Sequence, residues 1–358
     1  MLQALRRLTT GRPPAPSSPR ELLQALVRYD RASGLEHFLD RFDFTGVRPH
    51  QIYYSVLGRL PESARVATMP SDYDPRRHLR ETLLSPEFQS GLLARVLAAF
   101  PEKHRLFFVH VPKCAGSDLG SHLMQRYDGA YLGQLDQNPL HLLPELLPWR
   151  LQILMAGLAR HDTLALVGHF SLAWLLDEHL LRYGDTAFSV LRDPVDIAIS
   201  KANYVLTSIC RSDDAPAPDV RGWIEQFGLR AYAGGGVQDP AELQAATLRL
   251  LRDPRLAVGN TLCRFLGRGD ADSALDLCAA ADLELTTVSR YPAWLHQRWG
   301  VADSRRLNES RKFLDRTSLS SADLDYLNQI NDQDLRLYQR VERRLQEQGG
   351  LSVTGAAL

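Results

Sequence analysis

Three short apolar runs constrain the fold of this chain more than any other feature. They occupy residues 106–111 (LFFVHV), 164–168 (LALVG) and 187–191 (AFSVL), and each has the length of a β-strand. Runs that are apolar at almost every position are typical of strands buried on both faces of a sheet. Helical stretches lie between the runs. The sequence therefore predicts an α/β fold of three layers, with a parallel sheet covered by helices.

The remaining chain divides into regions around this alternating part. Residues 1–20 include a segment rich in Pro, Ser and Thr, and we expect them to form a flexible leader. Residues 21–100 show apolar residues at helical spacing and no strand-like alternation, which predicts an all-helical N-terminal domain. We assign residues 101–346 to the α/β domain, which we expect to be mostly helical from about residue 241, and residues 347–358 to a flexible tail.

Composition limits where a charged ligand can bind. The chain has 42 Lys and Arg residues against 42 Asp and Glu residues, so a local group of residues has to hold any anion. The four cysteines form no CxxC pair and no short Cys/His cluster, which argues against a disulfide framework or a structural zinc site. No apolar run approaches the ~20 residues of a membrane span. We expect a protein of a reducing, cytoplasmic setting.

The segment after the first apolar run has the character of an anion-binding loop. It reads PKCAGSD over residues 112–118 and leads into a helical pattern. Small residues let backbone N–H groups converge, the helix N-terminus adds partial positive charge, and Lys113 adds a full one, which suits a phosphate or a sulfate. The lysine precedes the glycine, unlike in the GxxxxGK[ST] loop of nucleotidases. An ordinary strand-to-helix turn with a solvated lysine remains the alternative.

A second candidate anion site follows the third apolar run. Arg192 ends that run, and Asp193 and Pro194 have the pattern of a helix N-cap followed by proline at the first helical position. Ser200 then lies about 9 Å along the helix axis from Pro194, at about 1.5 Å per residue, on a face that the guanidinium can share. Arg192 and Ser200 therefore predict a second phosphate site. The alternative is an arginine that only caps the sheet.

Together these motifs resemble those of sulfotransferases that use 3′-phosphoadenosine 5′-phosphosulfate (PAPS), the group that includes heparan 2-O-sulfotransferase and bacterial carbohydrate sulfotransferases. PKCAGS is similar to the family's 5′-phosphosulfate loop, and RDPVDIAIS is similar to its 3′-phosphate motif. Residues 168–170 resemble the family's GHF motif, and residues 259–267 its N-x-x-x-R-x-L-G helix. Residues 307–310 and 331–338 resemble the family's ending. The resemblance covers residues 106–345 and implies a P-loop-like sheet.

The resemblance implies a role for each candidate residue. Lys113 would stabilise the leaving phosphate, and His169 would be the general base that takes the acceptor's hydroxyl proton. Arg192 and Ser200 would hold the 3′-phosphate. The residues expected to contact PAPS are Lys113, Cys114, Ala115, Gly116, Ser117, Asp118, Arg192, Ser200, Ser310 and Arg311. We interpret the side chain of Cys114 as packing, and we expect no metal because sulfuryl transfer needs none in principle.

One residue departs from the family pattern. The family usually has Ser or Thr where this chain has Asp118, and a carboxylate ~5 Å from a phosphate would repel it by up to about 3 kcal/mol at an effective dielectric of 20. Asp118 would turn toward its own helix N-terminus, face the acceptor as a second candidate base, or weaken donor binding. Residues 308–312 (NESRK) resemble a family segment that closes near the nucleotide, and a solvated basic loop is the alternative.

The sequence favours a PAPS-dependent sulfotransferase that acts on a hydroxyl of an acceptor, which we expect to be a glycan. Residues 54–59 and 84–88 resemble a small helical domain that accompanies some bacterial glycan-modifying enzymes, which favours a saccharide. Two other classes remain open. One is a kinase-like phosphotransferase of related fold, and the other is a non-catalytic member that binds a nucleotide or a partner protein. We expect no nucleic acid partner, because the chain has no net positive charge.

Overall fold

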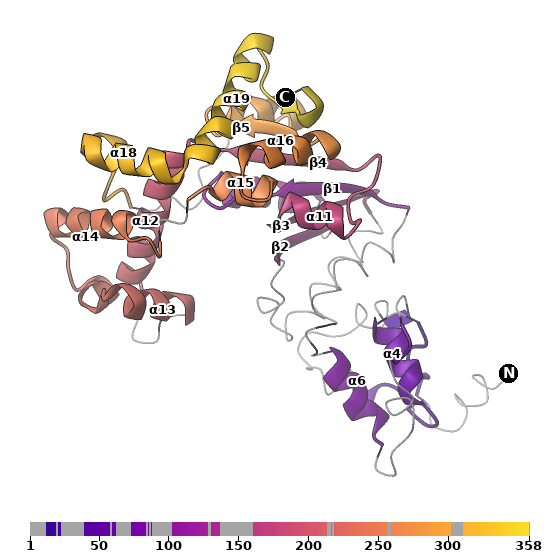
Figure 1. Ribbon diagram of the computed structural model, residues 1–358. Coiled ribbons are helices and arrows are strands. Elements are labelled where there is room, and N and C mark those ends of the chain that lie inside the picture. The colour runs from indigo at the N-terminus through magenta and orange to yellow at the C-terminus, as the bar shows by residue number, and fades with distance from the viewer. Residues whose placement is uncertain are drawn as a thin grey trace. The chain divides into compact units, whose positions relative to one another are not determined.

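The computed structural model divides the chain into two compact units (Figure 1). The first comprises residues 1–106, 123–168 and 182–185, and the second comprises residues 107–122, 169–181 and 186–358. Within them, the structure describes residues 12–18, 21–22, 39–57, 59–61, 73–83, 85, 87, 102–127, 130–136, 160–212, 216, 218–256, 259–301 and 311–357.

The first unit contains the helical segment predicted near the N-terminus. Its described helices are α4 (Pro49–Leu57) and α6 (Pro75–Leu83), which pack against each other. Both helices begin with proline, whose fixed φ fits the first turn and whose missing N–H leaves no donor unpaired. Pro14 forms an isolated parallel β-bridge with Asp43. The described part of the segment that we expected to be a flexible leader is therefore paired with the helical segment.

The predicted α/β fold is confirmed as a mostly parallel sheet flanked by helices. The strand order is β2-β3-β1-β4-β5-β6. The strands are β1 (His104–Val109), β2 (Tyr131–Asp136), β3 (Thr163–His169), β4 (Thr186–Leu191), β5 (Glu284–Thr287) and β6 (Val353–Thr354). β4 and β5 are parallel, and β6 pairs with β5 in the antiparallel sense. The three apolar runs correspond to β1, β3 and β4, which lie next to one another inside the sheet.

The sequence analysis missed β2, β5 and β6. β5 reads ELTT, so no apolar run marks it, yet its last three residues are buried. The hydroxyl of Thr286 donates to the carbonyl of Leu351 at 2.6 Å, which satisfies this buried polar group. β6 and the following 3₁₀-helix η6 (Gly355–Ala357) lie within residues 347–358, where we expected a flexible tail. The backbone of Gly355 donates to Leu283 at 2.8 Å and ties this end to the sheet.

Helices of the second unit pack on the sheet and on one another. α12 begins at Pro194 with Asp193 as its N-cap, as predicted, and the Asp193 carboxylate accepts the Val195 N–H at 2.9 Å. α12 packs against α13, α14 and α18, which lie around it in Figure 1. No helix within the described ranges is long and apolar enough to cross a membrane. The helices are α9 (Gly116–Tyr127), α11 (Leu172–Asp177), α12 (Pro194–Cys210), α13 (Pro218–Phe227), η4 (Arg230–Gly235), α14 (Pro240–Arg252), α15 (Thr261–Leu266), α16 (Ala271–Ala280), α17 (Tyr291–Trp299), η5 (Arg316–Ser318), α18 (Ser321–Ile330) and α19 (Asp332–Gln348).

The N-termini of α15 and α19 cap each other. Asn260 accepts hydrogen bonds from the backbone N–H groups of Gln333 (3.1 Å) and Asp334 (3.2 Å) at the start of α19. In return, the carboxylate of Asp334 accepts those of Leu262 and Cys263 at the start of α15, both at 2.8 Å. Four backbone donors that a helix start would leave unpaired are thus satisfied. Asn260 and Asp334 both belong to motifs that the sequence analysis singled out, so these motifs form one structural unit.

Replacing Asp334 tests the reciprocal cap. Asp334 is fully buried, so Asp334→Ala leaves two backbone donors without acceptors and is expected to lower the free energy of unfolding by about 1–3 kcal/mol. Asp332→Ala is the matched control, because Asp332 lies in the same first turn of α19 and is exposed. Urea unfolding of the two variants measures the difference. Equal losses of stability would contradict the capping role.

Candidate anion-binding and catalytic site

The main candidate residues converge at the carboxyl ends of three neighbouring strands. Lys113 follows β1, His169 ends β3, and Arg192 follows β4. These strands are adjacent in the order β3-β1-β4. The carboxyl ends of parallel strands meet at one edge of a sheet, where open α/β sheets bind their ligands. All three residues belong to the second unit.

The loop between β1 and α9 is tightly turned. Lys113 has a φ of 69° and Ala115 has a φ of 59°, a left-handed conformation that is uncommon for residues with a side chain. The loop leads directly into α9, where Leu119 donates its backbone N–H to Ala115 at 3.0 Å. A Cβ atom at Gly116 would lie 1.7 Å from Nε2 of His110. The His110 ring occupies the space that a side chain at this position would need, so any residue other than glycine would have to displace the ring.

The loop presents a positive charge and a helix N-terminus together. Ser117 is exposed in the first turn of α9, and the half-buried ammonium of Lys113 lies 4.0 Å from the centre of the Tyr204 ring. Burial, and then the charge of Arg192, lowers the pKa of Lys113 to about 8. The lysine is therefore mostly charged at pH 7. An anion bound beside it would favour the charged form and raise this pKa.

The second candidate anion site adjoins the first. The Nη1 atom of Arg192 donates to the carbonyl oxygen of Lys113 at 3.4 Å. Ser200 lies within the first two turns of α12 and is partly exposed. The carboxylate of Asp193 pairs with Arg316 at 3.1 Å. Two residues that the sequence assigned to different phosphates, Lys113 and Arg192, are thus brought into contact.

His169 is held in one orientation by His110. Its Nδ1 lies 2.9 Å from the carbonyl oxygen of His110, which can only accept a hydrogen bond, so Nδ1 carries the proton in this contact. In the neutral ring, Nε2 then keeps a free lone pair. The two imidazoles stack with centroids 4.2 Å apart. Burial, and then the charges of His169 and Lys113, lowers the pKa of His110 to about 3, so His110 stays neutral near pH 7.

His110 is a residue of the candidate site that sequence analysis missed. Because it stands between two valines, the sequence pattern includes it in the apolar run of residues 106–111. Its ring stacks on Phe108 with centroids 5.3 Å apart, which explains why a histidine fits an apolar strand end. The available signal was its place just beyond β1, where site residues of parallel sheets gather.

The segment that carries Arg311 runs along α12 in the opposite direction. Burial raises the pKa of Cys210, the last residue of α12, and the nearby charge of Arg311 opposes this rise. Further along the segment, buried Asn203 accepts the Leu314 N–H at 3.1 Å and donates to its carbonyl at 2.7 Å. Arg311 thus lies at the far end of α12 from Arg192 and is not brought to the two anion sites. Ser310 lies outside the described residues.

Asp118 contacts a residue of α17. It is 7% exposed, and its Oδ2 accepts a hydrogen bond from the hydroxyl of Tyr291 at 2.8 Å. Its Oδ1 is buried and 3.6 Å from Nε2 of His122. Burial, and then Asp118 itself, raises the pKa of Tyr291, which keeps its proton for this bond. The contact with Tyr291 differs from the three arrangements of Asp118 that the sequence predicts.

Cys114 is fully buried and burial raises its pKa to about 12, so it is a neutral thiol that packs in the core.

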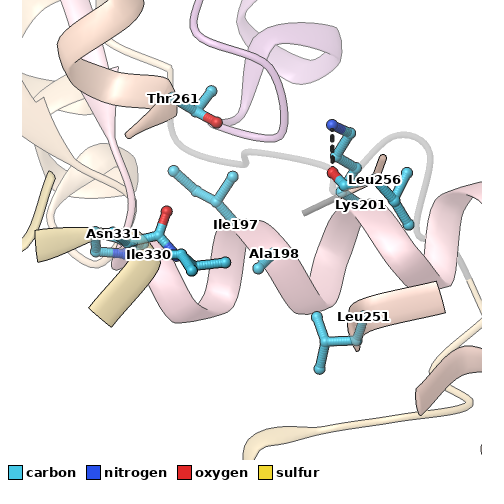
Figure 2. A pocket seen from close by; sticks show the side chains of 9 residues that line it. Ile197, Ala198, Lys201, Leu251, Leu256, Thr261, Ile330 and Asn331 are labelled. Atoms are coloured by element: carbon cyan, nitrogen blue, oxygen red, sulfur yellow. Dashed lines mark hydrogen bonds between the residues drawn. The ribbon is translucent and has the colours of Figure 1, made fainter. Parts of the chain in front are cut away.

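A cavity of about 20 Å³ beside α12 has room for one water and is too small for a nucleotide. Figure 2 shows this cavity, at which the ammonium of Lys201 donates to the carbonyl oxygen of Leu256 at 2.9 Å.

Among the residues that the structure describes, no group of three or more His, Cys, Asp or Glu could hold a metal ion.

A double-mutant cycle tests the contact between Asp118 and Tyr291. Tyr291→Phe removes the donor and leaves a buried carboxylate oxygen unpaired, which is expected to lower the free energy of unfolding by about 1–3 kcal/mol. In an Asp118→Asn background the same change is expected to cost less, because no buried charge is left behind. Urea unfolding of the four proteins gives the coupling energy. Equal costs of Tyr291→Phe in both backgrounds would show that the negative charge of Asp118 does not contribute to the bond.

Comparisons with known proteins assign this chain to no family. No family model matches it, and no curated protein sequence matches it. A function therefore has to come from the chain's own residues, from the geometry of its strand ends, and from the resemblance of its short motifs.

Proposed function

We propose that this chain is a PAPS-dependent sulfotransferase of P-loop-like fold, which transfers a sulfuryl group to a hydroxyl of a glycan. The contact between the two anion sites carries the proposal, because Arg192 Nη1 lies 3.4 Å from the carbonyl oxygen of Lys113. PAPS bears a phosphosulfate and a 3′-phosphate on one ribose, so it needs two neighbouring anion sites. His169, anchored on His110 at the same strand ends, supplies a base beside them.

The strand order supports the P-loop-like fold. From β1 the chain passes to the edge strand β2, returns through β3, and crosses to β4 on the other side of β1. The order therefore reverses at β1, and β1 is the strand whose loop carries Lys113. Ligands of open α/β sheets bind outside the carboxyl ends of the strands at such a reversal. The proposal of a glycan acceptor rests on the resemblance of residues 54–59 and 84–88 to a domain of glycan-modifying enzymes.

In the proposed reaction, the acceptor oxygen forms a bond to the sulfur of PAPS while the bond from sulfur to the 5′-phosphate breaks. Nε2 of His169 takes the hydroxyl proton, since Nδ1 is engaged with His110. The Lys113 ammonium stabilises the charge that develops on the leaving phosphate. Ser117 and the N-terminus of α9 hold that phosphate, and Arg192 with Ser200 binds the 3′-phosphate. The products are the sulfated acceptor and 3′-phosphoadenosine 5′-phosphate (PAP).

Nucleotide preference tests the donor. At about 100 times its Kd, PAP is expected to stabilise the protein by about 2.7 kcal/mol, or roughly 5–10 °C in Tm, and more than ADP or ATP with magnesium. Lys113→Ala and Arg192→Ala are expected to reduce this shift. Arg211→Ala is the matched control, since Arg211 is an exposed arginine at the C-terminal end of α12. A shift with ATP and magnesium alone would support a phosphotransferase instead, and no shift with any nucleotide would remove the donor from the proposal.

Replacing His169 separates the proton transfer from donor binding. In His169→Asn the amide nitrogen can replace Nδ1 as donor to the His110 carbonyl, but no atom replaces Nε2. We expect PAP to bind this variant as before, and transfer from radiolabelled PAPS to a panel of saccharides to fall by about 10²–10⁴-fold. Transfer at the original rate would exclude His169 as the base.

A further inference from the structure

The Lys113 ammonium rests on an aromatic ring. Its Nζ lies 4.0 Å from the centroid of Tyr204, which stands one helical turn after Ser200 on α12. Tyr204 is 42% exposed, and its ring also packs against the ring of Trp223 on α13, at 5.9 Å and an interplanar angle of 75°. The tyrosine therefore belongs to the surface at the strand ends, and Trp223 limits how far its ring can turn.

The charged and titratable groups around Lys113 do not favour its ammonium. Arg192 is positive, and its charge lowers the pKa of Lys113. His110 is neutral near pH 7. A Cys114 thiolate would raise the pKa of Lys113, but burial raises the pKa of this thiol to about 12, so it is neutral near pH 7 as well. The negative face of an aromatic ring attracts a cation without carrying a net charge. A carboxylate in the place of Tyr204 would hold the lysine as well, but it would repel an anionic ligand.

We propose that Tyr204 is a positioning residue, whose ring holds the Lys113 ammonium at the loop between β1 and α9 until an anion binds there. The inference rests on the proposed function, in which Lys113 meets the 5′-phosphate of the donor. Tyr204 keeps the lysine near the place where the phosphate arrives, so less side-chain freedom is lost on binding. The ring also favours the charged form of the lysine, which is the form that binds an anion.

Changes to Tyr204 are expected to move the titration of Lys113 in a set order. Tyr204→Phe keeps the ring and is expected to leave the pKa of Lys113 near its value of about 8. Tyr204→Leu removes the ring, disfavours the ammonium, and is expected to lower this pKa by about half a unit. Tyr204→Trp supplies a stronger π face and is expected to raise it. Loss of structure would expose Lys113 to water and raise its pKa, because burial is the main cause of its low value, so a misfolded protein cannot produce the decrease expected of Tyr204→Leu. The increase expected of Tyr204→Trp counts only if the Tm of that variant equals that of the original protein.

Two measurements on the full-length chain test whether the pKa of Lys113 changes in this order among the Tyr204 variants. Competitive acetylation with acetic anhydride over a pH series, followed by mass spectrometry, gives the pKa of Lys113 without any ligand. The Kd of PAP over the same series is expected to rise as pH passes the Lys113 pKa, because the ammonium loses its proton. At pH 8, PAP is expected to bind Tyr204→Leu about two- to fivefold more weakly than Tyr204→Phe.

The outcomes separate this inference from the proposed function. If Lys113 titrates at the same pH in the leucine, phenylalanine and tryptophan variants, Tyr204 does not position it, whatever nucleotide binds. If the titration follows the expected order and the Kd of PAP follows it too, both are supported. If the titration moves but PAP binds none of the proteins, the contact between Tyr204 and Lys113 stands and the proposed donor is overturned.

Discussion

The ring of His110 is the constraint on which the rest of the site depends. It fills the space beside Gly116, where a Cβ atom would come within 1.7 Å of its Nε2, so a larger residue at the start of α9 would have to displace the ring. The same residue stacks on His169, and its backbone carbonyl oxygen accepts a hydrogen bond from Nδ1 of His169. One residue at the end of β1 therefore sets both the loop that carries Lys113 and the direction in which His169 presents Nε2. Its low pKa keeps this double contact free of charge near pH 7.

The centre of the fold could be predicted because burial on both faces leaves a signal in every residue of a strand. β1, β3 and β4 have that signal, and the N-cap at Asp193 has a local one. β5 has neither, because its threonines are buried through hydroxyl bonds, such as that from Thr286 to Leu351, 65 residues away. β6 depends in turn on β5, against which it pairs. β5 and the edge strand β6 are specified by their tertiary partners, which spacing along the sequence does not reveal.

The candidate site, like the fold, could be predicted from the sequence only in part. The sequence places Lys113, His169 and Arg192 at strand ends, and the order of the strands brings those ends together. Contacts across the fold are not visible in spacing. Tyr291 meets Asp118 from 173 residues away, and nothing in the sequence indicated it. Tyr204 was equally hidden, because a tyrosine inside a helix gives no sign of which loop it faces.

Because the chain has no net charge, the partners of the carboxylates near Lys113 and Arg192 decide whether these two cations can bind an anion. Asp118 is bound by the uncharged hydroxyl of Tyr291, and Asp193 pairs with Arg316. Asp334 lies close enough to the loop for its charge to raise the pKa of Cys114, and two backbone N–H groups of α15 donate to its carboxylate. None of these carboxylates pairs with Lys113 or Arg192 in a contact among the described residues. Lys113 rests on a ring and Arg192 on a carbonyl oxygen, so none of these three carboxylates neutralises either cation. Lys113 is mostly charged near pH 7, and both cations can bind an anion although the chain as a whole has no net charge.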